Sequence, residues 1–175
     1  DLAMPCPKNA DTARLLIEHK ANVDAKDDEG RTALMYAENA DTVRVLLENN
    51  ADVDAKDRLG RTPLMYVTQD CGGYLMDYPR NAGTARLLIE HKADVDARDD
   101  EGRTPLMYAK SVDTARLLLE NGAELNARDN EGRTPLMHAI ADDRITLRYT
   151  RNADIARFLV ERGADLNARD NKGWT

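Results

Sequence analysis

Carboxylates, histidines and cysteines are the side chains of this 175-residue sequence whose types could support chemistry. The carboxylates gather in polar turns such as Asp27-Asp28-Glu29-Gly30, and oxygen-rich turns can hold calcium. A calcium loop aligned on Gly30 or Gly132 would place its first ligand on Ala25 or Ala127, and no glutamate stands at the closing position. Because alanine offers no side-chain oxygen, we do not predict calcium binding.

The three histidines are dispersed along the chain. His19 and His91 occupy equivalent positions near the ends of two predicted helices, where a cation suits the helix dipole. His138 takes the place of a tyrosine that recurs in other copies of the same motif, and the pattern implies no partner for any of the three. No phosphate-binding glycine loop, His-Glu-x-x-His pair or nucleophile elbow is present. We therefore predict no enzymatic activity, no catalytic residue, no cofactor and no metal site.

The composition is that of a soluble acidic protein. A net charge of −7 argues against a general nucleic-acid binder, which needs a cationic face. The apolar runs are too short for a membrane span, and no signal peptide opens the chain. Cys6 and Cys71 are not at equivalent positions, so we predict free thiols in a reducing compartment, the cytoplasm or a host cytosol. Since the chain begins at Asp1 and stops inside a repeat at Thr175, we expect a fragment of a longer protein.

One eight-residue motif organises the whole chain. It reads Gly-Arg-Thr-Pro-Leu-Met-Tyr-Ala at residues 102–109 and returns at Gly30, Gly60 and Gly132, with a truncated copy at Gly173. The motif alternates with a segment whose apolar residues fall three and four apart, as on one face of a helix. An Asn or Ser at the start of each segment can cap that helix. These helices are predicted over residues 9–18, 39–48, 81–90, 111–120 and 152–161.

The ends of these predicted helices need a left-handed residue. Gly122 and Gly163 suit that conformation, and Asn50 tolerates it. Lys20 and Lys92 stand at the same place, and we predict slight backbone strain there.

The repeating unit resembles the ankyrin repeat. The resemblance rests on the Gly-x-Thr-Pro-Leu opening, the Leu-Leu-rich second helix and the Gly-Ala-Asp-x-Asn-Ala exit, and it covers nearly the whole chain. It implies an all-α, ankyrin-type helix-turn-helix solenoid of about five units with projecting turn fingers. The family usually has histidine after Thr-Pro-Leu, and its imidazole bridge between neighbouring loops is absent here. Methionine takes that place at Met35, Met65, Met107 and Met137.

Short and long repeats alternate. Successive motif glycines are separated by 30, 42, 30 and 41 residues, from Gly30 to Gly173. The predicted single array over residues 1–175 therefore comprises six segments: a partial repeat at 1–29, short repeats at 30–59 and 102–131, long repeats at 60–101 and 132–172, and the start of a further repeat at 173–175.

The extra residues of the long repeats lie between their two helices, at 67–80 and 139–151. A Gly-Gly pair predicts a loop in the first, whereas the second lacks Gly and Pro and could lengthen its first helix. Tyr74, Tyr78 and Tyr149 are candidate partner-binding residues, since tyrosine often anchors interfaces. The alternative is that these segments only pack on neighbouring helices, because loop insertions cost little closure entropy.

The turn fingers are the second candidate surface, because ankyrin proteins commonly hold partners by the finger tips and the concave face of the first helices. An apolar tip residue in the pair Arg58-Leu59 is the sharpest hint of contact. The alternative is that finger Arg and Asp residues bridge to each other along the stack. The candidate partner-binding residues of the fingers are Arg58, Leu59, Arg61, Arg103, Arg133 and Trp174.

These observations predict a non-catalytic scaffold for protein–protein interaction. Its partner is expected to be another protein of unspecified identity, with no nucleic acid and no membrane span. Two alternatives stay open: a regulatory or targeting array belonging to a larger, enzymatic protein, and an inhibitor or immunity-type protein that occludes a toxin or enzyme.

Overall fold

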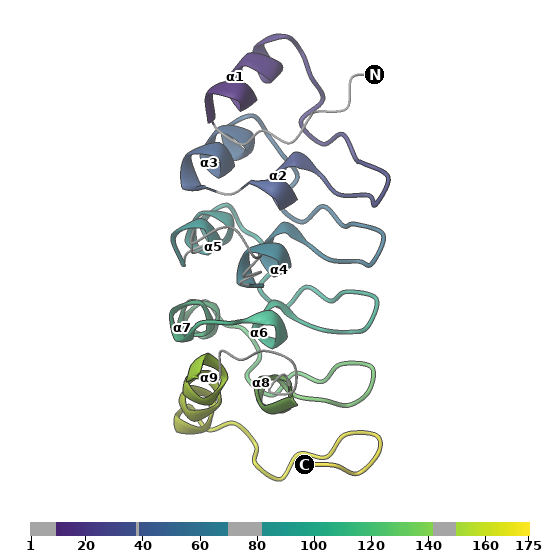
Figure 1. The fold of residues 1–175 in the computed structure, drawn as a ribbon, viewed down its shortest axis with the longest axis vertical. Coiled ribbons are helices and arrows are strands. Elements are labelled where there is room, and N and C mark those ends of the chain that lie inside the picture. Colours follow the sequence, from purple (N-terminus) through teal and green to yellow (C-terminus); the bar gives the residue numbers. More distant parts are fainter. Residues whose placement is uncertain (1–9, 38, 70–81, 142–149) are drawn as a thin grey trace. The chain divides into compact units, whose positions relative to one another are not determined.

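The computed structural model describes residues 10–37, 39–69, 82–141 and 150–175, of which residues 150–152 are described by their backbone alone, and those ranges contain helices and no strand. The helices alternate between short first helices and longer second helices (Figure 1). The first helices are α2 (Ala33–Tyr36), α4 (Pro63–Thr68), α6 (Pro105–Tyr108) and α8 (Pro135–Ala141). The second helices are α1 (Ala10–Glu18), α3 (Ala40–Glu48), α5 (Ala82–Glu90), α7 (Val112–Glu120) and α9 (Thr150–Glu161). This pattern confirms the all-α architecture predicted from the repeats.

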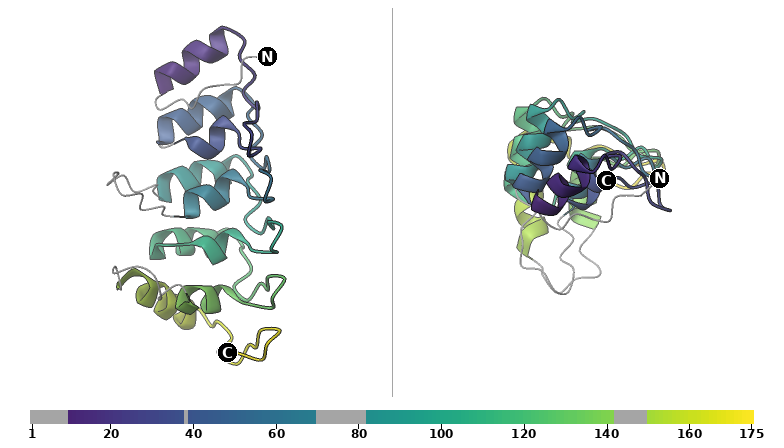
Figure 2. Two further views of the ribbon diagram at one scale, coloured as in Figure 1. Left: turned by 45° about the vertical axis from the view of Figure 1, so that its right-hand side comes forward. Right: turned by 90° about the horizontal axis from the view of Figure 1, so that it is seen from above.

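The chain divides into two compact units. Unit 1 comprises Asp1–Val67 and Cys71–Asp94, and unit 2 comprises Thr68–Asp70 and Val95–Thr175. In unit 1, helix α3 packs against both α1 and α5; in unit 2, α7 packs against α9 and α6 against α8. Within each unit the first and second helices form two layers, and the turns project from the first-helix side as fingers (Figure 2).

A Thr-Pro-Leu-Met stretch builds α4, α6 and α8, and Thr-Ala-Leu-Met builds α2. Thr104 precedes α6 in extended conformation, and Pro105 occupies the first turn, where its missing N–H costs nothing. Leu64 and Met65 of α4 are both 0% exposed, so methionine fills core space as predicted. Methionine offers no polar atom to the threonines nearby. Four buried threonine hydroxyls have no hydrogen-bond partner in the described part of the chain: those of Thr32, Thr42, Thr62 and Thr104.

The second helices follow the predicted capping and periodicity. The Asn39 side chain accepts a hydrogen bond from the Thr42 N–H at 2.8 Å, and the Ser111 hydroxyl accepts one from Thr114 N–H at 3.1 Å. Each inner face is buried, with Leu46 at 0% exposure in α3 as the example. The arginine of each second helix is exposed. In α1 and α3 this arginine pairs with an aspartate one turn earlier. In α7 the arginine is Arg116, and its guanidinium lies over the Phe158 ring.

Left-handed residues end the second helices, as predicted. Lys20, Asn50 and Lys92 have φ of 63°, 61° and 72°, beside Gly122 and Gly163 at 92° and 90°. The backbone N–H of Lys92 donates to Ile89 O and that of Ala93 to Leu88 O, which satisfies carbonyls of the last turn. The two lysines therefore carry strain that glycine avoids.

Polar side chains after each second helix join neighbouring repeats within each unit. The Asp24 carboxylate accepts a hydrogen bond from Asp52 N–H at 2.9 Å, and Asp54 accepts one from Asp94 N–H at 3.0 Å. In unit 2, Asp96 and Asn126 accept equivalent bonds from Glu124 and Asp165. Since carboxylate and amide oxygens serve equally at this position, the bond depends on the acceptor atom and not on its charge.

The long inter-helix segments lie largely outside the described residues. α4 has six residues and α8 seven, against four in α2 and α6. The extension of α8 to Ala141 agrees with the expectation that the second long segment lengthens its first helix. Leu15 of α1 is 55% exposed, and α1 packs against α3.

Candidate functional site

A buried carboxylate lies at the base of the second finger, the turn at residues 56–61. One oxygen of Asp57 accepts hydrogen bonds from the backbone N–H groups of Leu59 and Arg61, both at 2.8 Å. The other oxygen accepts from Arg61 Nε at 2.9 Å and from the Tyr66 hydroxyl at 2.6 Å. The Arg61 guanidinium also lies over the Tyr66 ring, 4.8 Å from its centroid. The carboxylate is thus enclosed by four donors, and its side chain is 1% exposed.

The same cluster recurs in the other fingers. It consists of Asp27, Arg31 and Tyr36 in the first finger, Asp99, Arg103 and Tyr108 in the third, and Asp129, Arg133 and His138 in the fourth. In the last finger Asp170 accepts from the backbone N–H groups of Lys172 and Trp174, and Trp174 stands at the position of the arginine. Every described finger therefore depends on one aspartate that orders its turn.

Local backbone geometry explains the spacing of these residues. In the third finger, Asp99 N–H donates to Arg103 O and Gly102 N–H donates to Asp99 O, which closes the turn. Gly102 has φ of 75°, and a Cβ there would lie 2.4 Å from Asn130 Oδ1 and 2.9 Å from Asn130 N. Glycine is therefore required both by the left-handed backbone and by the close approach of the next finger.

The cluster shifts the pKa values of its members. Burial opposes ionisation of Asp27, but hydrogen bonds from the Tyr36 hydroxyl and from Arg31 outweigh it and lower the carboxyl pKa to about 2. Burial and the hydrogen bond to Asp27 raise the pKa of Tyr36 to about 12. The pKa of Asp57 is likewise lowered, because the donors outweigh burial. These aspartates are ionised and their tyrosines neutral at pH 7, so the clusters hold charge without exchanging protons.

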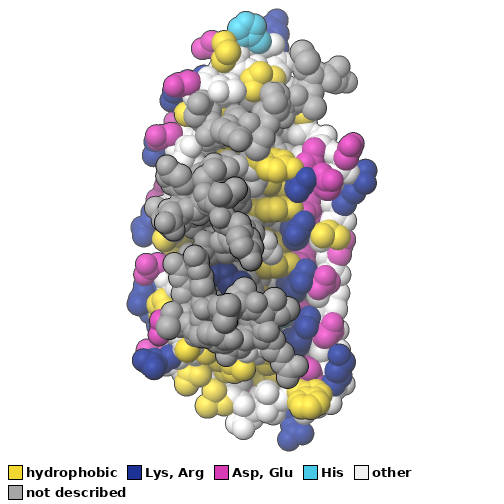
Figure 3. Space-filling model, in the orientation of Figure 1, with side chains coloured by type: hydrophobic (Ala, Val, Ile, Leu, Met, Phe, Trp, Pro, Cys, Tyr) yellow, Lys and Arg dark blue, Asp and Glu magenta, His cyan; other side chains and the backbone are white. Residues whose placement is uncertain are grey.

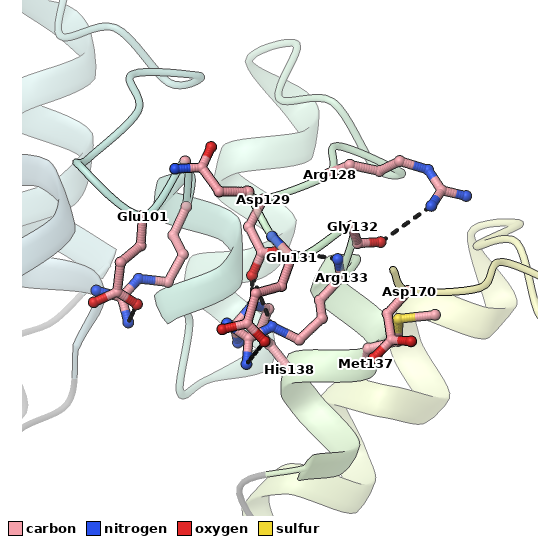
Figure 4. A network of polar contacts seen from close by, with 12 residues as sticks. Glu101, Arg128, Asp129, Glu131, Gly132, Arg133, Met137, His138 and Asp170 are labelled. Atoms are coloured by element: carbon pink, nitrogen blue, oxygen red, sulfur yellow. Dashed lines mark hydrogen bonds and ion pairs between the residues drawn. The ribbon is translucent and has the colours of Figure 1, made fainter. Parts of the chain in front are cut away.

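His138 gives the fourth finger a different donor (Figure 4). Its Nε2 lies 2.8 Å from Asp129 Oδ2, in the position that a tyrosine hydroxyl takes in the first three fingers. Burial lowers the pKa of His138, the hydrogen bond with Asp129 opposes that shift, and the charges of Arg133 and Arg103 support it. The expectation that His138 has no partner was wrong, because the repeat places an aspartate nine residues before it. His19 and His91 lie at the ends of second helices, as predicted. Nδ1 of each lies 2.8 Å from a carbonyl oxygen one turn earlier.

The predicted finger residues fall into two groups. Leu59 is 52% and Trp174 73% exposed, and Arg58 is exposed as well. The guanidinium groups of Arg61, Arg103 and Arg133 are instead held in the clusters, with side-chain exposures of 23%, 23% and 29%. Tyr74, Tyr78 and Tyr149 lie outside the described residues.

The arginines of the Gly-Arg-Thr motif pair with aspartates of their own fingers and not along the stack, so the expected bridges do not form at these residues. Each lies four residues after its aspartate, and that spacing closes a turn. Between fingers, Lys26 Nζ donates to Lys56 O at 2.9 Å and Arg128 donates to Arg169 O at 2.7 Å, and Lys172 Nζ lies 3.9 Å from Glu131 Oε2. The sequence contained the signal for the clusters, namely Asp, Arg and an aromatic residue at constant spacings of four and nine.

Tip glutamates complete three of the four arginine sites. Glu29 pairs with Arg31, Glu101 with Arg103 at 2.8 Å and Glu131 with Arg133 at 3.5 Å. In the second finger Leu59 occupies this position. Figure 3 shows the resulting surface, on which Lys and Arg side chains alternate with Asp and Glu along the fingers of each unit.

The chemistry available to these clusters is limited. Across the described ranges, no three His, Cys, Asp or Glu side chains are grouped as metal ligands would be. The described helices include none that is long and apolar enough to cross a membrane. Each cluster carboxylate already accepts several hydrogen bonds, so its arrangement suits holding a turn in place.

The family model for ankyrin repeats (three copies) matches residues 3–57, 39–129 and 75–170. A search of curated proteins found no match to the chain.

Proposed function

Because this chain belongs to the ankyrin-repeat family, we propose that it is a non-catalytic module that binds a partner protein through its turn fingers and the first helices behind them. Ankyrin repeats are generally protein–protein interaction modules and are typically non-catalytic. Solenoid repeats use extended surfaces contributed by successive units for this purpose.

The observation that carries the proposal is a contrast between the base and the tip of each finger. The base is constant, since an aspartate orders every described turn. The tip varies and is exposed, as at Asp28, Arg58, Asp100, Asn130 and Asn171. A tip held by a buried base is ordered before a partner arrives, so binding costs little conformational entropy. Different tips on the same base offer different contacts without a change of fold.

Site-specific photo-crosslinking tests this function. A photoreactive residue at Asp100 or Asn130 reports on the tips, whereas one at Glu48 or Glu120 reports on the exposed ends of second helices. We expect a discrete crosslinked protein from the tip positions in an extract of the source cells, and none from the helix-end controls. Crosslinks from the helix ends alone, or from no position, would reject the fingers as the binding surface.

A further inference from the structure

The second finger, residues 56–61, has an unusual charge, and we call it the cationic finger. Its three cations, Lys56, Arg58 and Arg61, accompany one anion, Asp57, whereas the chain as a whole has net charge −7. The equivalent finger at residues 26–31 has two cations and three anions. The excess positive charge of the cationic finger is therefore local.

The charge of Asp57 is directed inward. Its carboxylate is buried and engaged by four donors, so it offers little attraction to a molecule at the tip. Arg61 pairs with Asp57 at 2.8 Å and with no second carboxylate among the described residues, because Leu59 stands where three other fingers have glutamate. The Arg61 side chain is 23% exposed, so part of it is accessible to solvent.

Arg58 and Leu59 complete the accessible surface. Arg58 is exposed, and the described residues form no ion pair with its side chain. Leu59 is 52% exposed and lies on a turn whose backbone is fixed by Asp57. An exposed apolar side chain on the same turn as two arginines can combine desolvation with charge-assisted hydrogen bonds to a carboxylate.

We propose that the cationic finger docks a protein segment that carries an Asp or Glu side chain next to a large apolar side chain. The apolar group covers Leu59, and the carboxylate pairs with Arg58 and Arg61. This inference rests on the proposed function and specifies the partner chemistry at one finger. The first finger gives the docked segment a direction: Arg58 N–H donates to Glu29 O at 2.9 Å, which brings the acidic pair Asp28-Glu29 alongside. A partner carboxylate is repelled there, so it approaches from the Arg61 side.

The test uses a phage-displayed library of random peptides selected against the full chain. We expect selected peptides to share an Asp or Glu beside Leu, Ile, Phe or Trp. Their affinity, measured by fluorescence polarisation, should fall as salt is added, because the exposed charges become screened. Leu59→Glu reproduces the residue of three other fingers and gives Arg61 an ion-pair partner, so the fold should be retained. This variant should weaken binding about tenfold or more, equivalent to about 1.4 kcal/mol.

Leu166→Glu is the matched control. Leu166 is 60% exposed and lies outside the fingers, so this variant adds the same charge with a similar loss of apolar surface. We expect it to bind the selected peptides within about twofold of the parent chain, a difference of about 0.4 kcal/mol. Equal weakening by both variants would show a general effect of charge and overturn the proposal. Peptides without acidic residues would overturn it too.

Two further outcomes separate this proposal from the proposed function. A fluorescent oligonucleotide that binds the chain and is released by Leu59→Glu, with no acidic peptide selected, would assign the finger to phosphate and reject the peptide. If crosslinks form from Asp100 or Asn130 but Leu59→Glu keeps full affinity for the selected peptides, the cationic finger is rejected as the docking site. The proposed function would then still stand. Absence of crosslinks from every finger would reject the proposed function.

Discussion

Removal of the Asp57 carboxylate should destabilise the protein far more than removal of Asp27. The two residues accept the same kinds of hydrogen bond in successive fingers of unit 1. They differ in burial: the Asp57 side chain is 1% exposed and the Asp27 side chain 31%. Only at Asp27 can water replace the lost oxygens.

The magnitudes follow from that difference. Asp57→Ala leaves the Arg61 guanidinium and two backbone N–H groups without their acceptor in a closed site, which costs about 3–5 kcal/mol. Asp27→Ala should cost about 1–2 kcal/mol, because solvent reaches the vacated site. Urea unfolding followed by circular dichroism measures both values. Equal losses, or a larger loss at Asp27, would refute the view that buried charge pairing holds the fingers.

Asp57→Asn separates charge from hydrogen bonding at the same site. The amide oxygen can still accept from the Leu59 and Arg61 backbone, but the pairing with the Arg61 charge is lost. In the folded protein the pKa of Asp57 lies below its ordinary value of 3.8. The ionised carboxylate therefore stabilises the fold above pH 3.8, and this stabilisation is lost as pH falls through the folded pKa. The stability difference between the parent and Asp57→Asn should therefore shrink in acid. A difference that stays constant from neutral pH to acid would contradict an electrostatic role.

Three further changes have defined expected effects. Lys92→Gly should raise the free energy of unfolding by about 1 kcal/mol in urea titrations, because φ of 72° strains lysine but not glycine. Thr62→Val should change that free energy by less than about 0.5 kcal/mol, since the buried hydroxyl makes no hydrogen bond with described residues. Asp54→Asn should stabilise by about 0.5 kcal/mol at pH 7, because burial raises the pKa of Asp54 and the nearby carboxylates of Asp94 and Asp52 raise it further. A raised carboxyl pKa means that the ionised form destabilises the fold, so the gain from Asp54→Asn should fade as acid protonates Asp54 in the parent chain. Thermal unfolding at pH 7 and at an acidic pH would detect this change.

Much of the fold could be predicted because each repeat repeats its own local rules. Apolar spacing located the second helices, and the caps at Asn39 and Ser111 formed as expected. The left-handed helix ends at Lys20 and Lys92 were predicted from their alignment with glycines alone. These features depend on residues within a few positions of each other, which is the range over which sequence patterns specify geometry.

The finger clusters were less accessible to sequence reasoning. The pairing of the motif arginines within their own fingers was not predicted, because a striped surface of Arg and Asp fits pairing within a turn as well as pairing between turns. His138 was missed because a histidine beside arginines gives no sign of a carboxylate partner unless the turn geometry is known. The spacing of Asp129 to His138 equals that of Asp57 to Tyr66, so an explicit comparison of repeat positions would have found it.

Leu59 shows how recognition can change in this fold without a cost in structure. Arg61 keeps its bonds to Asp57 at 2.9 Å and 2.8 Å although its tip carboxylate is missing, and the corresponding Arg31 bonds to Asp27 are 3.0 Å and 2.8 Å. The base is therefore indifferent to the tip residue two positions before the arginine. A substitution at the tip alters surface charge and apolar area, whereas a substitution of the base aspartate removes the turn itself. If Leu59→Glu changed unfolding free energy as much as Asp57→Ala does, tip and base would not be independent, and the fingers could not vary their contacts on a fixed frame.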